Sequence, residues 1–286
     1  MAANPSTPSG KVSSELALRV ISAVVLLVVA LAALWLGGWV FAVLTALAST
    51  AILYEWIGMT GPYAQRAAPK ASMLFVAVTV VMAYRDPTTS LAAACLVALG
   101  MMLAGVADQR LRWLAAGVIY AAIPGICAVL LRGQGDDGVP SLDFLAVAFV
   151  FVVVWVTDSA AYFAGRLIGG PKLAPRFSPK KTWSGAIGGA TGAVVVGVAM
   201  LRLRGVEAGI IIALISLVLS VISQIGDLIE SAMKRHFGVK DSGNLIPGHG
   251  GIMDRVDGLV FALVAATAIA FARTGGDGLG AGLLVW

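Results

Sequence analysis

The sequence predicts an all-α protein, a polytopic integral membrane helical bundle of about nine transmembrane helices with a cytoplasmic N-terminus. Three observations support this fold class. Of the 286 residues, 59% are hydrophobic and only 12% are charged, and the mean hydropathy of +0.93 lies far above that of soluble domains. The hydrophobic residues form runs long enough to cross a bilayer. The basic residues lie in the short connections between these runs, where they set the topology.

The first two spans come from one uncharged run, residues 20–54. As a single helix this run would extend about 52 Å, whereas the hydrocarbon core of a bilayer is about 30 Å thick. Gly37 and Gly38 divide it, because glycine accepts the backbone conformations of a tight turn. We therefore expect spans near 17–36 and 39–57. The first is too long for a signal-peptide core and lacks a clear cleavage site, so we expect it to be retained.

Seven further apolar runs complete the bundle. They lie near residues 71–84, 88–107, 113–131, 142–164, 184–201, 208–228 and 256–272. The run at 71–84 is short for a span. With the N-terminus inside, fifteen of the twenty Lys and Arg residues fall in cytoplasmic segments, as the positive-inside rule expects. The external connection with Arg202 and Arg204 runs against this pattern.

Acidic residues gather at the ends of the last two spans. Asp227, Glu230 and Lys234 stand at i, i+3 and i+7 and share one helix face, which becomes polar at the membrane surface. Asp254 and Asp257 recur at i, i+3 where the next span begins, so two helix ends can present carboxylates to one place. Carboxylates beside basic residues are typical of Mg²⁺ shared with substrate phosphates.

A glycine-rich stretch lies between these two helix ends. Gly250 and Gly251 follow His249, and glycines let backbone N–H groups approach an anion closely. Asp254 lies where the next helix would start, so a surface loop capped by Asp254 is the structural alternative. The density of glycine, aspartate and histidine favours a phosphate-binding loop.

A second group of residues covers 155–185. Asp158 lies inside an apolar span, where a carboxylate is costly and therefore indicates a functional site. A loop broken by prolines follows, with the basic residues Arg166, Lys172, Arg176, Lys180 and Lys181. A topological anchor is the alternative for this loop. Basic residues opposite the carboxylates would neutralise charge in phosphoryl or nucleotidyl transfer. The small residues at Gly185, Gly188, Gly189 and Gly192 predict close helix packing.

Together these motifs resemble the phosphatidate cytidylyltransferases, also called CDP-diacylglycerol synthases. The resemblance covers roughly residues 150–260, including Asp158, Tyr162, Gly165 and the segments 178–183 and 226–231. Its C-terminal signature is Ser231, Lys234, Arg235, Lys240, Asp241, Ser242, Gly243, Pro247, His249, Gly250, Gly251, Asp254, Arg255 and Asp257. The family commonly has Glu where this chain has Ser184, which leaves the role of that position open.

The resemblance implies transfer of the cytidylyl group of CTP to phosphatidate, giving CDP-diacylglycerol and pyrophosphate in phospholipid biosynthesis. It implies one or two Mg²⁺ ions and a site that faces the cytoplasm at the inner membrane. The expected partners are CTP, phosphatidate from the bilayer and membrane lipids, with a homodimer as an option. Nucleic acid is not an expected partner, because the basic residues lie in short loops between apolar runs.

The expected roles divide as follows. Asp227, Asp254 and Asp257 are the expected metal ligands and, with Lys234 and Arg235, the expected catalytic residues. The expected substrate-binding residues are Ser178, Lys180, Lys181, Thr182, Lys240, Asp241, His249, Gly250, Gly251, Arg255 and Asp158. The expected organisation is a disordered cytoplasmic tail at 1–14, a transmembrane scaffold at 15–135, a transmembrane catalytic part at 136–273 with cytoplasmic loops 165–183 and 229–255, and a Gly-rich tail at 274–286.

Two alternatives remain from the residues alone. A CTP-dependent lipid kinase of the polyprenol type would transfer the γ-phosphoryl group to a hydroxyl and would need a catalytic base more. A cation transporter would use the carboxylates as an ion path, but it predicts carboxylates at the middle of the bilayer. Radiolabelled CTP distinguishes these functions. Label that enters lipid from the α position indicates cytidylyl transfer, label only from the γ position indicates a kinase, and no label in lipid indicates another function.

Overall fold

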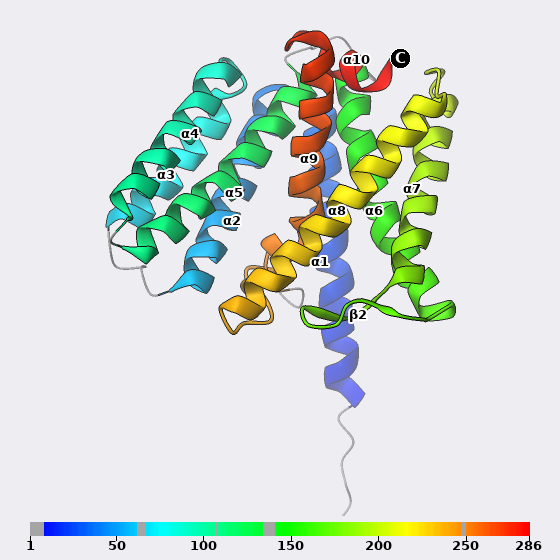
Figure 1. Cartoon of the computed structure of the whole chain (residues 1–286), viewed down its shortest axis with the longest axis horizontal. Coiled ribbons are helices and arrows are strands. Elements are labelled where there is room, and N and C mark those ends of the chain that lie inside the picture. The colour runs from blue at the N-terminus through cyan, green and yellow to red at the C-terminus, as the bar shows by residue number, and fades with distance from the viewer. Residues whose placement is uncertain (1–8, 62–66, 107, 134–140, 247–249) are drawn as a thin grey trace, which may run out of the picture.

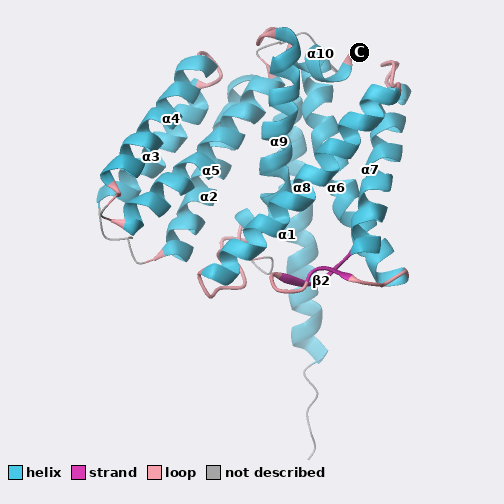
Figure 2. Cartoon of the chain, viewed as in Figure 1, coloured by secondary structure: helices cyan, strands magenta, loops and turns pink. Residues whose placement is uncertain are grey.

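The computed structural model describes residues 9–61, 67–106, 108–133, 141–246 and 250–286. Within these residues the chain forms ten helices and one two-stranded hairpin (Figures 1 and 2). The helices are α1 (Ser9–Leu36), α2 (Gly38–Thr60), α3 (Ala67–Met82), α4 (Pro87–Ala104), α5 (Gln109–Arg132), α6 (Leu142–Leu167), α7 (Trp183–Leu203), α8 (Ile210–His236), α9 (Met253–Thr274) and α10 (Leu279–Leu284). The strands are β1 (Lys172–Ala174) and β2 (Ser178–Thr182).

Successive helices from α1 to α9 run in alternating directions along the bundle (Figure 1). Of the described helices, α2 and α4–α9 are long and apolar enough to cross a membrane, and α1 and α3 contain the shorter apolar stretches Val20–Leu36 and Ala68–Met82. The predicted all-α polytopic membrane bundle is thus confirmed. The count of nine spans and the side of the N-terminus stay predictions.

The start of α1, the hairpin and the connection between α8 and α9 lie at one end of the bundle, and α10 lies at the other end (Figure 1). This arrangement places the two long segments that were expected to carry the chemistry on the same side. The α8–α9 connection is shorter than the predicted loop 229–255, because α8 continues to His236 and α9 begins at Met253.

Three segments differ from the sequence-based expectations. The helix α1 starts at Ser9, inside the segment expected to be a disordered tail, of which residues 1–8 lie outside the described residues. The basic loop contains an antiparallel hairpin in which Lys172 pairs with Thr182 and Ala174 with Ser178. The Gly-rich tail contains α10, which packs on α9 and α6. Its leucines Leu279, Leu283 and Leu284 are buried, so apolar burial orders a helix too short to span a membrane.

Close packing joins α6 to α7 through small residues. A Cβ atom on Gly185 would lie 2.9 Å from the carbonyl oxygen of Ala161, and one on Gly189 would lie 2.8 Å from that of Thr157. Larger residues at these positions would force the helices apart. The prediction of close packing is confirmed, and this contact fixes the two helices that the hairpin connects.

Candidate functional site

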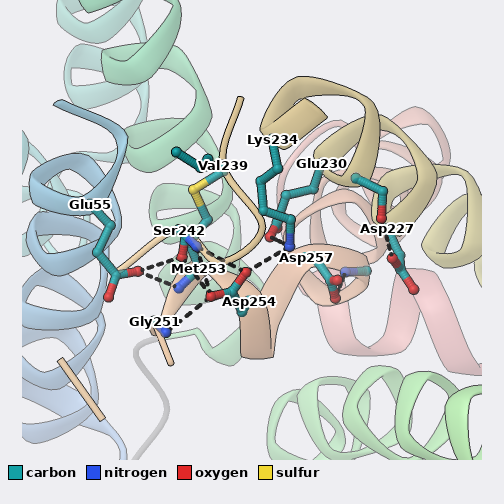
Figure 3. Close-up of polar contacts among 12 residues, drawn as sticks. Glu55, Asp227, Glu230, Lys234, Val239, Ser242, Gly251, Met253, Asp254 and Asp257 are labelled. Carbon is teal, nitrogen blue, oxygen red and sulfur yellow. Dashed lines mark hydrogen bonds and ion pairs between the residues drawn. The ribbon is translucent and has the colours of Figure 1, made fainter. Parts of the chain in front are cut away.

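The chemistry-bearing side chains come from five elements at one end of the bundle. They lie on the last turns of α8, the first turns of α9, the strand β2, the end of α2, and α6, which carries Asp158. Figure 3 shows a row of polar side chains that runs from Glu55 through Ser242, Asp254 and Lys234 to Asp227. This row joins the N-terminal and C-terminal halves of the chain.

Asp254, on the first turn of α9, accepts hydrogen bonds from four donors (Figure 3). They are Lys234 Nζ at 2.6 Å, the Ser242 N–H and Ser242 Oγ at 2.9 Å each, and the Gly251 N–H at 3.0 Å. Only 9% of its side chain is exposed. Asp254 therefore folds the α8–α9 connection back onto the start of α9, which is the structural role considered from the sequence. These contacts do not test a role in catalysis.

Lys234 lies between two carboxylates. Its Nζ also lies 2.9 Å from Oε1 of Glu230, one helical turn earlier on α8. The Glu230 side chain is fully buried and accepts a hydrogen bond from the Tyr120 hydroxyl at 3.2 Å. A buried charge is costly unless it is paired, so Lys234 and its carboxylates stabilise one another. Of the predicted helix face formed by Asp227, Glu230 and Lys234, Lys234 is the residue that contacts Asp254 on α9.

Lys181 on β2 forms an ion pair with Asp227 on α8. The hairpin and the carboxylates are therefore brought together, as the two segments were expected to be. The Asp257 carboxylate lies close enough to Asp227, Glu230 and Asp158 for their negative charges to repel one another. Asp227 and Asp158 repel each other in the same way. The Asp257 carboxylate accepts a hydrogen bond from the N–H of Gly258 at 2.7 Å.

Several predicted residues lie at the edge of this site. Lys180, Lys240, Asp241 and Arg255 are exposed, and Ser178 is half-buried in the hairpin. The Arg235 guanidinium donates to the carbonyl oxygen of Val239 at 2.9 Å and so ties the end of α8 to the connection that follows. His249 lies outside the described residues. Gly250 has φ of +82°, a left-handed conformation that favours glycine.

Thr182 and Ser184 fix the start of α7. The Oγ1 atom of Thr182 accepts a hydrogen bond from the Gly185 N–H at 3.1 Å, which is the usual N-cap contact. Ser184 Oγ donates to the carbonyl oxygen of Gly169. Ser184, where the family commonly has Glu, thus closes the hairpin segment onto the end of α6.

Sequence reasoning missed Glu55 and gave Glu230 no role in the site. Glu55 is 2% exposed and contacts Ser242, Ile252 and Met253, almost 200 residues further along the chain. The available signal was its position directly after the uncharged run 20–54. An acidic residue in a span indicates a specific role, as was inferred for Asp158.

The donor set fits a divalent cation in chemistry, because oxygen ligands are what Mg²⁺ prefers. Within the described part of the chain, however, no three His, Cys, Asp or Glu side chains lie close enough to hold one ion together. Asp227 is paired with Lys181, whereas Asp254 belongs to the contacts around Lys234 and Ser242. The predicted ligands Asp227, Asp254 and Asp257 thus lie at the same end of the bundle but not around one point.

The chain is similar to known proteins over almost all of its length. Residues 17–272 match a family model described as the cytidylyltransferase family. A Brucella suis protein named phosphatidate cytidylyltransferase is 43% identical over 256 residues, which cover 87% of this chain and 91% of the relative. A Staphylococcus haemolyticus protein of the same name is 48% identical over 118 residues, or 41% of this chain and 45% of the relative.

Proposed function

The chain belongs to the cytidylyltransferase family, and from this premise we propose that it transfers the cytidylyl group of CTP to phosphatidate, giving CDP-diacylglycerol and pyrophosphate. The observation that carries the proposal is the likeness to the Brucella protein, which extends through both halves of the chain.

The reaction makes one bond and breaks another. An oxygen of the phosphatidate phosphate attacks the α-phosphorus of CTP, and the bond from that phosphorus to the bridging oxygen breaks as pyrophosphate leaves. The attacking phosphate is already ionised near neutral pH, so no strong general base is needed. The protein must instead position two phosphate groups and neutralise their charge.

The basic residues of the hairpin and the α8–α9 connection are suited to hold phosphate groups. Lys180 and Lys240 are exposed, and Lys181 is half-buried beside Asp227. Arg255 is exposed on the first turn of α9 and supplies a further positive charge at this end of the bundle. We assign CTP to this end of the bundle, with Lys180, Lys181, Lys240 and Arg255 facing its phosphates.

Mg²⁺ remains the proposed cofactor. Because Asp227, Asp254 and Asp257 do not surround one point in this structure, they would act as its ligands only after their side chains move, and the bound ion would neutralise charge on the phosphates. In this structure Asp227 pairs with Lys181 and Asp254 pairs with Lys234. These lysines hold the two carboxylates in place and balance part of their charge. Asp158 completes the acidic group from α6.

The proposed location is the inner membrane of a bacterium, with the site facing the cytoplasm. The relatives are bacterial proteins, and the many apolar helices require a membrane. Because the site lies at helix ends, phosphatidate can reach it sideways from the bilayer while CTP arrives from the aqueous side. A homodimer stays a prediction, which the mass of the purified protein in detergent would decide.

Labelled CTP tests the proposal. Purified protein in detergent–lipid micelles should move label from the α position of CTP into lipid in the presence of phosphatidate. Transfer of only the γ label would identify a lipid kinase, and transfer of neither label would refute both. A variant of the exposed residue Asp277, at the other end of the bundle, serves as a control for the preparation.

A further inference from the structure

We infer that Glu55 on α2 is a positioning residue that holds the α8–α9 connection and the start of α9 in the geometry that the reaction requires. The kinetic part of this inference rests on the proposed function. Its structural part rests on three hydrogen bonds that cross from the N-terminal scaffold to the C-terminal part. Figure 3 shows the two that involve Ser242 and Met253.

Glu55 supplies the N-terminal cap of α9 from another helix. Its Oε1 accepts the Ile252 N–H at 2.9 Å, and its Oε2 accepts the Met253 N–H at 2.8 Å. The first N–H groups of a helix have no partner within the helix, and a side chain just before the helix usually satisfies them. The N-cap residue Ile252 makes no side-chain cap of its own. Glu55 therefore performs this task across the bundle.

Glu55 is also linked to Asp254 through one hydroxyl. Ser242 Oγ lies 3.1 Å from Oε2 of Glu55 and 2.9 Å from Oδ2 of Asp254. A serine hydroxyl has a single hydrogen, so Ser242 donates it to one of the two carboxylates at a time. The shared hydroxyl couples the positions of Glu55 and Asp254. A displacement of Glu55 would thus reach Asp254 through Ser242 and through the first turn of α9.

Two glycines of the connection close around the Glu55 side chain. A Cβ atom on Gly243 would lie 2.8 Å from Cγ of Glu55, and one on Gly251 would overlap Ser242 Oγ and the Glu55 carboxylate. The backbone at these two glycines therefore lies so close to Glu55 that a residue with a side chain does not fit at either position. With 2% exposure, Glu55 cannot touch a substrate, so its effect on the reaction must pass through the residues that it holds.

The end of α2 is itself held in place. The indole N–H of Trp56 donates to the carbonyl oxygen of Trp113 on α5 at 2.8 Å. Trp113 in turn contacts Phe237 at the end of α8, with ring centroids 4.8 Å apart. The residue next to Glu55 is thereby fixed to α5 and, through it, to α8. These contacts hold the end of α2 in place, so that Glu55 can set the position of α9.

The test compares Glu55→Gln with Glu207→Gln, a matched change at an exposed residue in the α7–α8 connection, at the opposite end of the bundle. Glutamine keeps the size of the side chain but replaces one acceptor oxygen with an NH₂ group, which cannot accept from an N–H donor. We expect hydrogen exchange at the amides of Ile252 and Met253 to become about tenfold faster or more. We expect kcat to fall about tenfold or more while the KM for CTP changes less than about threefold. Glu207→Gln should change neither quantity.

Two milder variants keep the inference testable if Glu55→Gln does not fold. Glu55→Asp retains both acceptor oxygens and should recover part of the lost kcat. Ser242→Ala removes only the shared hydroxyl and should lower kcat less than Glu55→Gln, because the two backbone hydrogen bonds remain. Normal kcat in all folded Glu55 variants, with only a lower melting temperature, would show a purely structural role and overturn the inference.

The exchange measurement also separates this inference from the proposed function. If the wild-type protein transfers no α label, the proposed function fails, but faster exchange at Ile252 and Met253 in Glu55→Gln would still establish that Glu55 holds the start of α9. If exchange at these amides does not change, the positioning role is refuted whatever the reaction is.

Discussion

Replacing Asp254 with asparagine separates its two roles, because the substitution keeps the size of the side chain and removes its charge. Three donors, the N–H and Oγ of Ser242 and the N–H of Gly251, point to Oδ2, and Lys234 Nζ points to Oδ1. Either orientation of an amide turns its NH₂ group toward at least one of these donors. At least one charge-assisted hydrogen bond is therefore lost.

The magnitude follows from the burial of the pair. The Lys234 and Asp254 side chains are 12% and 9% exposed. Removing one partner of a buried pair costs about 3–5 kcal/mol, and because asparagine keeps one acceptor and Lys234 keeps Glu230, we expect a cost of about 2–4 kcal/mol. For a chain of this size, that change lowers the melting temperature by about 3–7 °C. If Asp254 is also a metal ligand, turnover falls by at least about a hundredfold, or about 2.7 kcal/mol of transition-state stabilisation.

The assay measures both quantities on the same preparation. Melting is followed in detergent, and transfer of α label from CTP is followed below the melting range of the variant, where it should be inserted and monodisperse. Asp277→Asn, an exposed residue near α10, should change neither quantity. A lower melting temperature with near-normal turnover would show that Asp254 is only a structural cap. An unchanged melting temperature would contradict the contacts described above.

Three further predictions concern the metal, the glycine-rich stretch and the topology. Turnover should require a divalent cation and stop on chelation, and full turnover in excess EDTA would refute the proposed metal site. Gly250→Val should severely reduce turnover and stability, because valine strains φ of +82° and its Cβ would lie 3.2 Å from Asp254 Oδ2; normal melting and turnover would refute this reasoning. Reporter fusions after Lys70 and Arg176 should read cytoplasmic and a fusion after Asp136 external, and one reversal would contradict nine spans.

The sequence predicts those parts of the fold that depend on local composition. Apolar runs located the described helices α1 to α9 to within a turn or two at most ends. The spacing of Gly185 and Gly189 predicted close helix packing, and the structure shows that α6 is the partner. The short helix α10 was not predicted, because its order comes from the burial of Leu283 and Leu284 against distant helices. Such burial leaves no periodic signal in a segment of six residues.

The candidate site was predictable where short sequence motifs mark it, at the end of α8, at the start of α9 and in the basic loop 165–183. Lys234 and Asp254 were named from helix spacing and loop composition, and they do form an ion pair. The sequence could not show that this pairing uses Asp254 as a structural anchor, since the donors Ser242 and Gly251 come from an irregular connection. It also could not show that Glu55 belongs here, because only tertiary packing brings α2 to the start of α9.

The charges at this end of the bundle explain why a cation is expected there. Five carboxylates and two lysines contact one another or lie within electrostatic reach of one another: Asp158, Asp227, Glu230, Asp254, Asp257, Lys181 and Lys234. When all are ionised, this group has an excess of three negative charges, and the proposed substrates add further negative charge. Like charges that lie close together in a partly buried place repel strongly. Because Lys181 and Lys234 already face carboxylates, they offset little of the charge of CTP, and that task falls to Lys180, Lys240, Arg255 and a bound cation. The expected dependence of turnover on a divalent cation is therefore supported by the charges of this chain's own residues as well as by its family.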